Sequence, residues 1–295
     1  MTHAFHGLPP LVITVCPTGM VPRRRDFPAV PEQPDEIAAD VRRAVRAGAT
    51  SAHLHARDAD GEPTPALERY AEVVRAVRDE APDLVISVST SGRVHRTFEE
   101  RSAVLDLARD DELRPDLASL TLGSLNFPTQ ASVNDPAMIQ RLAHAMRERG
   151  IVPELEIFDF GMIDYAHYLI ERRVLEPPFV CNLLLGSLGT AAATPLNLAS
   201  MVERLPAGTY WQAAGIGRFQ WPMNALAVVT GGHVRTGLED NLHMDPGKRT
   251  QATNEALVRR VASLATASGR RLATPSDARA LMGLAPRDRA VAAAR

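Results

Sequence analysis

The chain has 295 residues, 45% of them apolar, so it can bury a substantial core as one large domain or as two ordinary ones. Its formal charge of −2 gives no overall bias toward nucleic acid or anionic lipid. No apolar run approaches the roughly 20 residues that span a bilayer, and the first residues lack a secretory signal pattern, so we expect a cytoplasmic protein with no membrane or nucleic-acid partner.

Short apolar runs alternate with segments of helical periodicity along the whole chain. We expect strands at 11–19, 51–57, 84–91, 117–124, 152–159, 179–186, 209–217 and 233–240. We expect the helices behind them at 35–48, 66–80, 97–109, 135–149, 161–173, 195–204, 222–231 and 252–268, and a terminal helix at 275–283. Cys16 and Cys181 fall in two of the apolar strands without CxxC spacing, which predicts buried free thiols.

An unbroken series of eight β-α units is typical of an α/β protein with a closed (β/α)8 barrel, the TIM barrel. A doubly wound open sheet is the alternative. It usually has fewer strands and often a Gly-rich turn after the first, and PTG at 17–19 is no dinucleotide fingerprint. Because no linker or repeat interrupts the pattern, we predict a single (β/α)8 barrel domain over residues 1–295, with a short C-terminal helical extension.

The second expected strand, SAHLHARD at 51–58, is unusually polar for the wall of a barrel. Alternate residues of a strand share a face, so His53, His55 and Arg57 point one way. Two imidazoles and a guanidinium do not suit an apolar core, whereas a metal ion can bind the imidazoles of such a face. A lone HxH pair is still a weak signal, and its weight depends on a further ligand from elsewhere in the barrel.

Glu239, at the end of the last expected strand, supplies a carboxylate at the same end of the barrel. With His53 and His55 it completes the three-ligand set of a catalytic zinc, although Fe(II), Co(II) or Mn(II) can occupy the same set. A metal-bound histidine also needs an acceptor for its other ring nitrogen, and we expect Asp58 or Glu156 to supply one.

Further polar side chains fall near the ends of the expected strands. They are Ser87, Ser89, Ser91, Ser119, Thr121, Glu154, Glu156, His233, Arg235 and Asp240. A single inward Ser or Thr is more often a packed residue, His233 is better read as structural, and Glu154 equally suits a structural ion pair. The hydroxyls with Gly92 suit a carboxylate, and Arg235 with Asp240 supplies a cation and a base. The set fits carbon–carbon bond chemistry at a β-keto acid.

Seven stretches combine into a pattern that runs in order along nearly the whole chain. They are HLHARDADGEPT (53–64), STSGR (89–93), GSLNF (123–127), PELEIFDFGM (153–162), AGIGR (214–218), TGGHVRTGLEDN (230–241) and LATPSDAR (272–279). Together they resemble the β-keto acid cleavage enzymes, whose named reference activity is 3-keto-5-aminohexanoate cleavage. The combination of HLHxRD with GGHxRxGxED is specific.

The resemblance implies a zinc-containing TIM barrel, usually a homotetramer. The family reaction condenses a β-keto acid with acetyl-CoA and cleaves the product by a retro-Claisen step to acetoacetate and a new acyl-CoA. Carried over by motif position, His53, His55 and Glu239 would hold the zinc, and Asp240 with Arg235 would be the proton-transfer pair. The implied substrate contacts are Ser89, Gly92, Ser119, Thr121 and Glu156.

Three positions depart from the reference enzyme. A threonine and an asparagine match Ser119 and Thr121 there, and an acidic residue suited to the ammonium group of the substrate matches Val21. An apolar residue cannot pair with a cation, so we expect a substrate without an amino group. It would be a neutral or apolar β-keto acid, or an anionic one if Arg23 or Arg24 turns inward.

Two other functional classes compete with this interpretation. A metal-dependent hydrolase of the amidohydrolase kind is also a barrel with HxH, but it places HxH after the first strand and needs histidines on later strands. A non-catalytic barrel that binds a metabolite is the other, and the complete set of zinc ligands with an acid–base pair argues against it.

Overall fold

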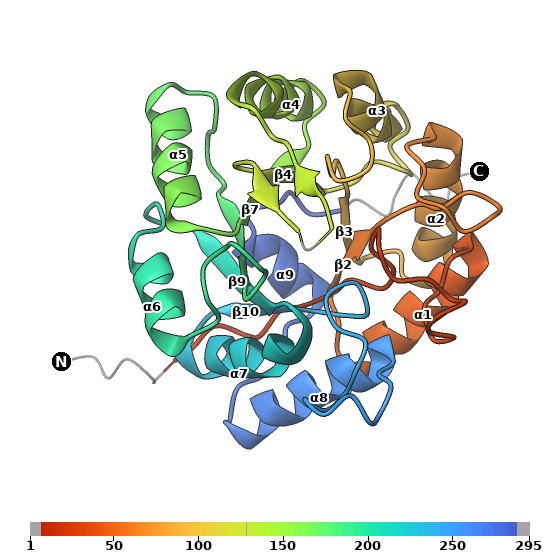
Figure 1. The fold of residues 1–295 in the computed structure, drawn as a ribbon, viewed down its shortest axis with the longest axis vertical. Coiled ribbons are helices and arrows are strands. Elements are labelled where there is room, and N and C mark those ends of the chain that lie inside the picture. The colour runs from red at the N-terminus through yellow and green to blue at the C-terminus, as the bar shows by residue number, and fades with distance from the viewer. Residues whose placement is uncertain (1–6, 128, 288–295) are drawn as a thin grey trace.

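The computed structural model describes residues 7–127 and 129–287. Its centre is a closed barrel of parallel strands in the order β1-β10-β9-β8-β7-β4-β3-β2, enclosed by helices (Figure 1). The barrel strands are β1 (Ile13–Val15), β2 (Ser51–Leu54), β3 (Val85–Val88), β4 (Leu117–Thr121), β7 (Val152–Ile157), β8 (Val180–Leu185), β9 (Tyr210–Gly215) and β10 (His233–Thr236). The predicted (β/α)8 barrel is therefore confirmed.

The helices follow the strands in the predicted order. They are α1 (Pro34–Ala47), α2 (Leu67–Glu80), α3 (Phe98–Ser102), α4 (Pro136–Glu148), α5 (Phe160–Glu171), α6 (Pro195–Glu203), α7 (Gln220–Thr230), α8 (Asn254–Ala267) and α9 (Pro275–Leu281). None of the helices in the described part of the chain has the length and apolarity that crossing a membrane requires.

Most strands are a few residues shorter than predicted, and three further differences bear on the site. The helix predicted at 97–109 is a short α-helix, α3, that continues as a 3-10 helix over Ala103–Arg109. The last strand ends at Thr236 rather than at residue 240, because the chain turns there. A small antiparallel hairpin, β5 (Leu125–Asn126) with β6 (Ala131–Ser132), was not predicted, since two-residue strands are too short to show alternation.

Local sequence signals explain why the helices begin and end where they do, as α1 illustrates. Pro34 occupies its first turn, and the side chains of Gln33 and Glu36 form a reciprocal capping box. Gly48 closes the helix with φ of 119°, a left-handed conformation that favours glycine. The apolar side of the helix then packs in the main core between the barrel and the helical layer.

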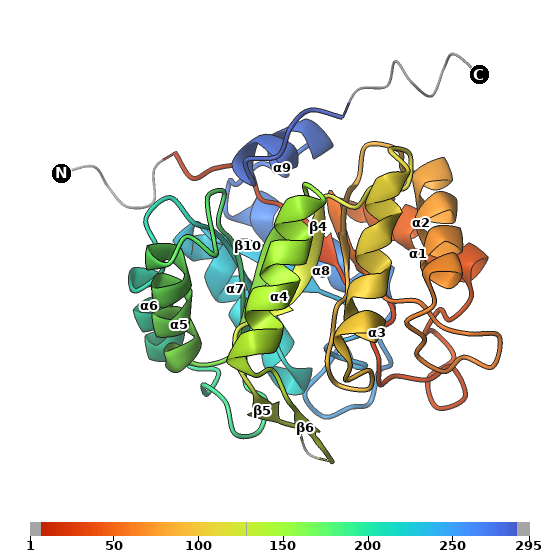
Figure 2. The same ribbon diagram turned by 90° about the horizontal axis from the view of Figure 1, so that it is seen from above.

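The interior of the barrel changes from apolar to polar along its axis. Its N-terminal end is closed by apolar side chains that cluster with α9: Val12, Val85, Leu117, Val180, Tyr210, Ala278 and Met282. Figure 2 shows α9 at one end of the barrel and the β5–β6 hairpin at the other. The polar layers lie between them, toward the C-terminal ends of the strands, where a barrel places its chemistry.

Candidate active site and metal centre

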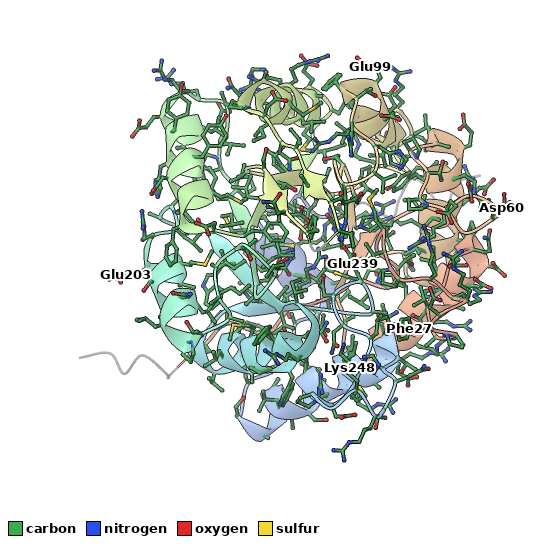
Figure 3. All side chains as sticks on the ribbon, viewed as in Figure 1. Phe27, Asp60, Glu99, Glu203, Glu239 and Lys248 are labelled. Carbon is green, nitrogen blue, oxygen red and sulfur yellow. The ribbon has the colours of Figure 1, made fainter. Side chains whose placement is uncertain are left out.

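A cavity of about 620 Å³ opens at the C-terminal ends of the barrel strands. Glu239 lies toward the middle of the molecule in Figure 3, whereas Asp60, Glu99 and Glu203 lie at its periphery. The predicted site residues that line the cavity are Val21, His53, His55, Ser89, Thr121, Glu156, Arg235, Glu239 and Asp240. A volume of this size suits a small-molecule substrate together with part of a larger cosubstrate.

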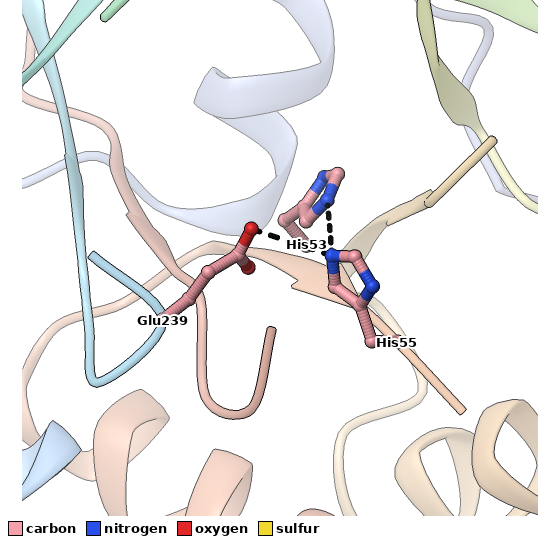
Figure 4. A group of neighbouring side chains, drawn as sticks. All are labelled: His53, His55 and Glu239. Atoms are coloured by element: carbon pink, nitrogen blue, oxygen red, sulfur yellow. Dashed lines mark hydrogen bonds and ion pairs between the residues drawn. The ribbon is translucent and has the colours of Figure 1, made fainter. Parts of the chain in front are cut away.

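His53, His55 and Glu239 converge at this cavity (Figure 4). Nε2 of His53 lies 3.2 Å from Nε2 of His55, which in turn lies 3.3 Å from Oε1 of Glu239. Two donors of one tetrahedral zinc, each near 2.1 Å from the ion, stand about 3.4 Å apart. The second oxygen of Glu239 is buried without a partner among the described residues. The donor set therefore fits a divalent transition-metal ion.

Glu154 orients the first of these histidines. Its Oε2 accepts hydrogen bonds from Nδ1 of His53 at 3.1 Å and from the hydroxyl of Ser87 at 2.5 Å. This contact leaves Nε2 of His53 facing His55. The prediction that Asp58 or Glu156 would fill this role is wrong, because Asp58 accepts backbone N–H groups of its own turn and Glu156 accepts from Thr121. The acceptor is Glu154, which lies on the same strand as Glu156, β7, two residues closer to the start of that strand.

Burial and neighbouring charges have opposing effects on the pKa values of His53, Glu239 and Glu154. Burial disfavours the charged imidazole of His53, but the carboxylates of Glu239 and Glu154 outweigh it and raise the pKa of His53. Burial also opposes ionisation of Glu239, yet Arg235 and the two histidines hold its pKa well below the usual range. Glu154 behaves similarly, since its contact with His53 overcomes burial and lowers its pKa. Both carboxylates therefore remain available as anions beside the imidazoles.

The turn after β10 carries Glu239 into the site, and two glycines make its approach possible. Gly237 has φ of 157°, and a Cβ there would lie 2.1 Å from the carbonyl oxygen of Cys16. A Cβ on Gly19, with φ of 64°, would lie 2.5 Å from Cγ of Glu239. A side chain at either position would therefore push the loop after β1 away from this turn.

A buried amide fixes the same turn from behind. Oδ1 of Asn254 accepts from the backbone N–H of Leu238, and its Nδ2 donates to the carbonyl of Pro17. Gln220 adds a bond from its side chain to the carbonyl of Gly237. Sequence analysis missed both amides, because each lies in the first turn of a helix and nothing in its local pattern indicates that it turns inward.

Arg235 joins the carboxylates on the other side of the site. Its Nε donates to Oδ2 of Asp240 at 2.9 Å, and its Nη2 donates to Oε1 of Glu239 at 2.7 Å and to Oδ1 of Asp240 at 3.2 Å. Oε1 of Glu156 lies 3.8 Å from Nη1 of the same guanidinium. Burial raises the pKa of Asp240 and of Glu156 even though Arg235 opposes both shifts. Asp240 is thus a buried, oriented carboxyl group that takes up a proton more readily than an ordinary aspartate.

Two of the predicted substrate contacts lie outside the cavity lining. Ser119 is 2% exposed, and its hydroxyl oxygen accepts from the backbone N–H of Thr90 at 3.1 Å. Gly92 packs against a buried arginine, since a Cβ there would lie 2.6 Å from NH1 of Arg101. Thr121 does line the cavity, but its hydroxyl donates to Glu156 at 2.6 Å. Both hydroxyls of β4 thus already have partners within the protein.

Arg57, which shares the polarity of the HxH strand, does not face the metal ligands. β2 ends at Leu54, and the guanidinium of Arg57 donates to the carbonyl oxygens of Gly19, Pro22 and Gly61 at 2.7–2.8 Å. It is 1% exposed. Its role in the fold is to hold the loop after β1, which carries Val21, against the loop after β2.

Polar residues on other strands were also missed from sequence. Gln212 donates to Oε1 of Glu154 at 2.8 Å and accepts from the hydroxyl of Thr14, which extends the network below the histidines. Asn182 is fully buried on β8, with neither side-chain polar atom bonded to a described residue. Each follows the alternation of its strand, so counting inward positions on β8 and β9 would have found them.

Comparison with known proteins places this geometry in context. Residues 10–284 match the family model described as beta-keto acid cleavage enzyme. The chain is 40% identical over 275 residues to the 3-keto-5-aminohexanoate cleavage enzyme of Fusobacterium nucleatum, covering 93% of this chain and 98% of that protein. It is also 40% identical over 279 residues to the 3-oxoadipate:acetyl-CoA acetyltransferase of Cupriavidus necator, covering 93% and 95%. Among solved structures, apo ObcA aligns with a TM-score of 0.77 at 23% identity, over 87% of this chain and 66% of that one, which shows a shared fold.

Proposed function

This chain belongs to the beta-keto acid cleavage enzyme family, and from that premise we propose that it is a zinc-dependent enzyme that converts a β-keto acid and acetyl-CoA into acetoacetate and a new acyl-CoA. The family relationship makes it an acetyl-CoA-dependent, C–C bond cleaving transferase. The observation that carries the finer proposal is the convergence of the His53, His55 and Glu239 ligand atoms within 4.8 Å of one another, beside Asp240 in the same cavity.

The proposed reaction balances without a redox cofactor. The carbon between the ketone and the carboxylate loses a proton, and its electron pair attacks the acetyl thioester, releasing the CoA thiolate. The thiolate then attacks the original ketone. Cleavage of the bond between that ketone carbon and the central carbon gives the new acyl-CoA. The central carbon keeps the acetyl group and the carboxylate and takes back a proton, which gives acetoacetate. Bound zinc would polarise the substrate ketone and so lower the energy of the developing negative charge.

Residues of this chain supply the proton transfer. Asp240 is the proposed base, because it lines the cavity beside the proposed metal ligands and burial raises its pKa, which makes it a stronger proton acceptor than an ordinary aspartate. Arg235 holds both oxygens of Asp240 and also one oxygen of Glu239, so the base and the proposed metal ligand keep a fixed separation. Glu156, with Thr121 donating to it, is the proposed second carboxyl group at the reacting carbon.

We propose that the substrate has no amino group. Val21 lines the cavity, and apolar residues make up much of its wall: Met20, Leu125, Phe127, Phe158, Leu184, Leu188 and Ile216. Two acidic residues also line the mouth, but Asp245 accepts backbone N–H groups of Arg249 and Thr250, and Asp26 is largely exposed beside Arg25. The three other acidic residues of the lining, Glu156, Glu239 and Asp240, all contact Arg235. Among the residues that the structure describes, the cavity therefore offers an ammonium group no free buried carboxylate in place of the missing acidic residue.

An acetyl-CoA-dependent assay over a panel of β-keto acids, with acetoacetate and acyl-CoA as measured products, tests this function. We expect turnover by protein that carries about one zinc per chain, and loss of turnover after chelation with recovery on adding zinc. Asp240→Asn should lower kcat by about 10²–10⁴-fold while zinc stays bound. Absence of bound metal, or full activity of a His53→Ala/His55→Ala variant, would contradict the zinc proposal. 3-Keto-5-aminohexanoate as the best substrate would contradict the substrate proposal.

A further inference from the structure

Arg93 places a cation in the cavity without giving it an anionic partner. It lies in the loop between β3 and α3 and lines the cavity together with Ser89 and Ser91. Among the residues that the structure describes, its guanidinium has no hydrogen-bond or ion-pair partner, and its Nε is buried. Burial lowers its pKa, with Glu239 opposing that shift. A half-buried guanidinium without a counter-ion costs free energy that a bound anion would recover.

An aromatic ring holds this guanidinium in a defined position. Its central carbon lies 3.7 Å from the centroid of the Phe127 ring. Stacking of this kind occupies one face of the planar group and leaves the N–H groups along its edge free to donate. The arrangement differs from a solvated surface arginine, because the side chain is fixed while its donors are unused.

Other cations of the cavity either have partners or are exposed. Arg235 contacts three carboxylates, and Arg23 donates to Gly61 and to the carboxylate of Glu62. Arg218 and Lys248 line the cavity but are exposed to solvent. Arg93 is therefore, within the described part of the chain, the half-buried cation of this cavity that an incoming anion can neutralise.

Two hydroxyl groups lie on the same loop. The hydroxyl oxygen of Ser89 accepts from the backbone N–H of Ser91, and that of Ser91 accepts from the backbone N–H of Arg93. Neither hydroxyl donates its proton to a described residue, in contrast to Thr121, whose hydroxyl donates to Glu156. The loop after β3 therefore presents two O–H donors and a guanidinium to the cavity in succession, whereas on β4 the hydroxyl of Thr121 is engaged by Glu156 and Ser119 lies outside the cavity lining.

We propose that Arg93, with Ser89 and Ser91, forms the anion subsite that binds a carboxylate of the β-keto acid. The inference rests on the proposed function and extends it, because it adds a cationic anchor, Arg93, and the hydroxyl of Ser91 to Ser89, which the family resemblance already implies as a substrate contact. The chemistry of the subsite fits either the carboxylate next to the reacting carbon or a second carboxylate on the side chain of the substrate.

Arg93→Gln and Arg93→Lys test the subsite, with Arg96→Gln as a matched control three residues along the same loop and outside the cavity lining. We expect Arg93→Gln to raise KM for β-keto acids by about 10–100-fold, the range of a lost charged hydrogen bond, and to leave KM for acetyl-CoA unchanged. Arg93→Lys should recover part of the loss, because the charge remains while the paired geometry does not. Arg96→Gln should behave like the parent enzyme.

The substrate panel distinguishes the two carboxylates. Equal weakening of 3-oxopentanoate and 3-oxoadipate assigns the subsite to the carboxylate beside the reacting carbon, whereas weakening of 3-oxoadipate alone assigns it to a second carboxylate. Unchanged KM values for every β-keto acid, or an effect confined to acetyl-CoA, would overturn the proposal.

Calorimetric binding of 3-oxopentanoate in the absence of acetyl-CoA separates this inference from the proposed reaction. Should the parent protein bind 3-oxopentanoate in an Arg93-dependent manner without turning it over, the subsite stands and the reaction fails. If the parent protein turns over its substrate but binding does not depend on Arg93, the proposed reaction stands and the subsite fails. Failure of the parent protein to bind any of these carboxylates would overturn the subsite directly. Melting temperatures of the variants show whether a loss reflects unfolding, and Ser91→Ala provides a second, milder variant of the same subsite.

Discussion

At the scale of single residues, Glu154 shows how a carboxylate below the site can act on chemistry that it does not touch. It accepts from His53, Ser87 and Gln212, and it is 1% exposed. A carboxylate that accepts the far N–H of a metal-bound histidine fixes its tautomer and increases its basicity. From sequence, Glu154 suited a structural ion pair equally well, because its distance from His53 depends on the register between strands that are not neighbours in the chain.

Glu154→Gln should weaken metal binding without removing a metal ligand. The amide keeps the shape of the side chain but loses the charge that holds the imidazole, so we expect zinc affinity to fall by about 10–100-fold. Equilibrium dialysis with zinc measures this independently of turnover. Glu148→Gln, at an exposed position of α4, is the control. A folded Glu154→Gln protein with the affinity of the parent would contradict the positioning role.

His233 has the opposite character, since it is kept neutral. Its Nδ1 accepts from the backbone N–H of Val12 at 3.1 Å, and its ring stacks on Tyr210 with centroids 4.3 Å apart. Burial, with Arg270 nearby, lowers its pKa to about 3. The sequence interpretation of this histidine as structural agrees with its place at the N-terminal end of the barrel, away from the cavity lining.

Stability should therefore fall in mild acid. Because the pKa is lower in the folded state than in the unfolded one, the contribution is complete above about pH 6.5 and is lost as the pH falls toward 3. Between pH 6.5 and 5 the loss is about 2 kcal/mol from this residue. Urea unfolding at both pH values measures it. His233→Asn, which keeps an acceptor for Val12, should reduce this pH dependence, and His144→Asn on the exposed face of α4 should not.

At the scale of elements, α9 explains how the barrel is closed opposite its active site. It is only seven residues long, with Pro275 in its first turn and a capping box between Thr274 and Asp277. Ala278 is fully buried and Met282, just after the helix, is 1% exposed, both against the first residues of the barrel strands. The predicted terminal helix is thus part of the barrel core rather than an appendage.

Met282→Ala should test this closure. Removing a buried methionine side chain costs about 2–5 kcal/mol in the free energy of unfolding, because apolar contacts are lost and a cavity remains. Denaturant unfolding of the variant measures the change. Leu196→Ala, whose side chain is 74% exposed on α6, should stay within about 0.5 kcal/mol of the parent. Equal effects of the two substitutions would show that α9 does not seal the barrel.

The helices and strands could be predicted wherever the apolar periodicity extended over enough residues to distinguish a helix from a strand. Eight strands and their helices were placed within a few residues, because each β-α unit carries its own alternation and capping signals. The prediction was least accurate at the C-terminal ends of strands, where Glu239 lies on a turn rather than on a strand. The chain leaves regular structure there because glycines and buried amides determine its course, and these leave no periodic signal.

At the scale of the whole molecule, barrel closure makes distant segments neighbours. β1 pairs with β10, so the loop after the first strand meets the turn after the last. Leu11 also pairs with Leu272 through a parallel bridge, which ties the start of the described chain to the segment before α9. The metal-ligand group therefore assembles only in the closed barrel, since its histidines come from β2 and its carboxylate from beyond β10.

The sequence by itself determined the (β/α)8 fold, the family and the three residues whose ligand atoms converge, because periodicity and local motifs are properties of neighbouring residues. Only the tertiary structure shows that Glu154 accepts from the ring of His53 and that Arg57 donates to the loop after β1. It also shows that Arg93 lines the cavity without a counter-ion among the described residues. Those facts depend on strand register and on the paths of loops, where small shifts exchange one hydrogen-bond partner for another of similar chemistry.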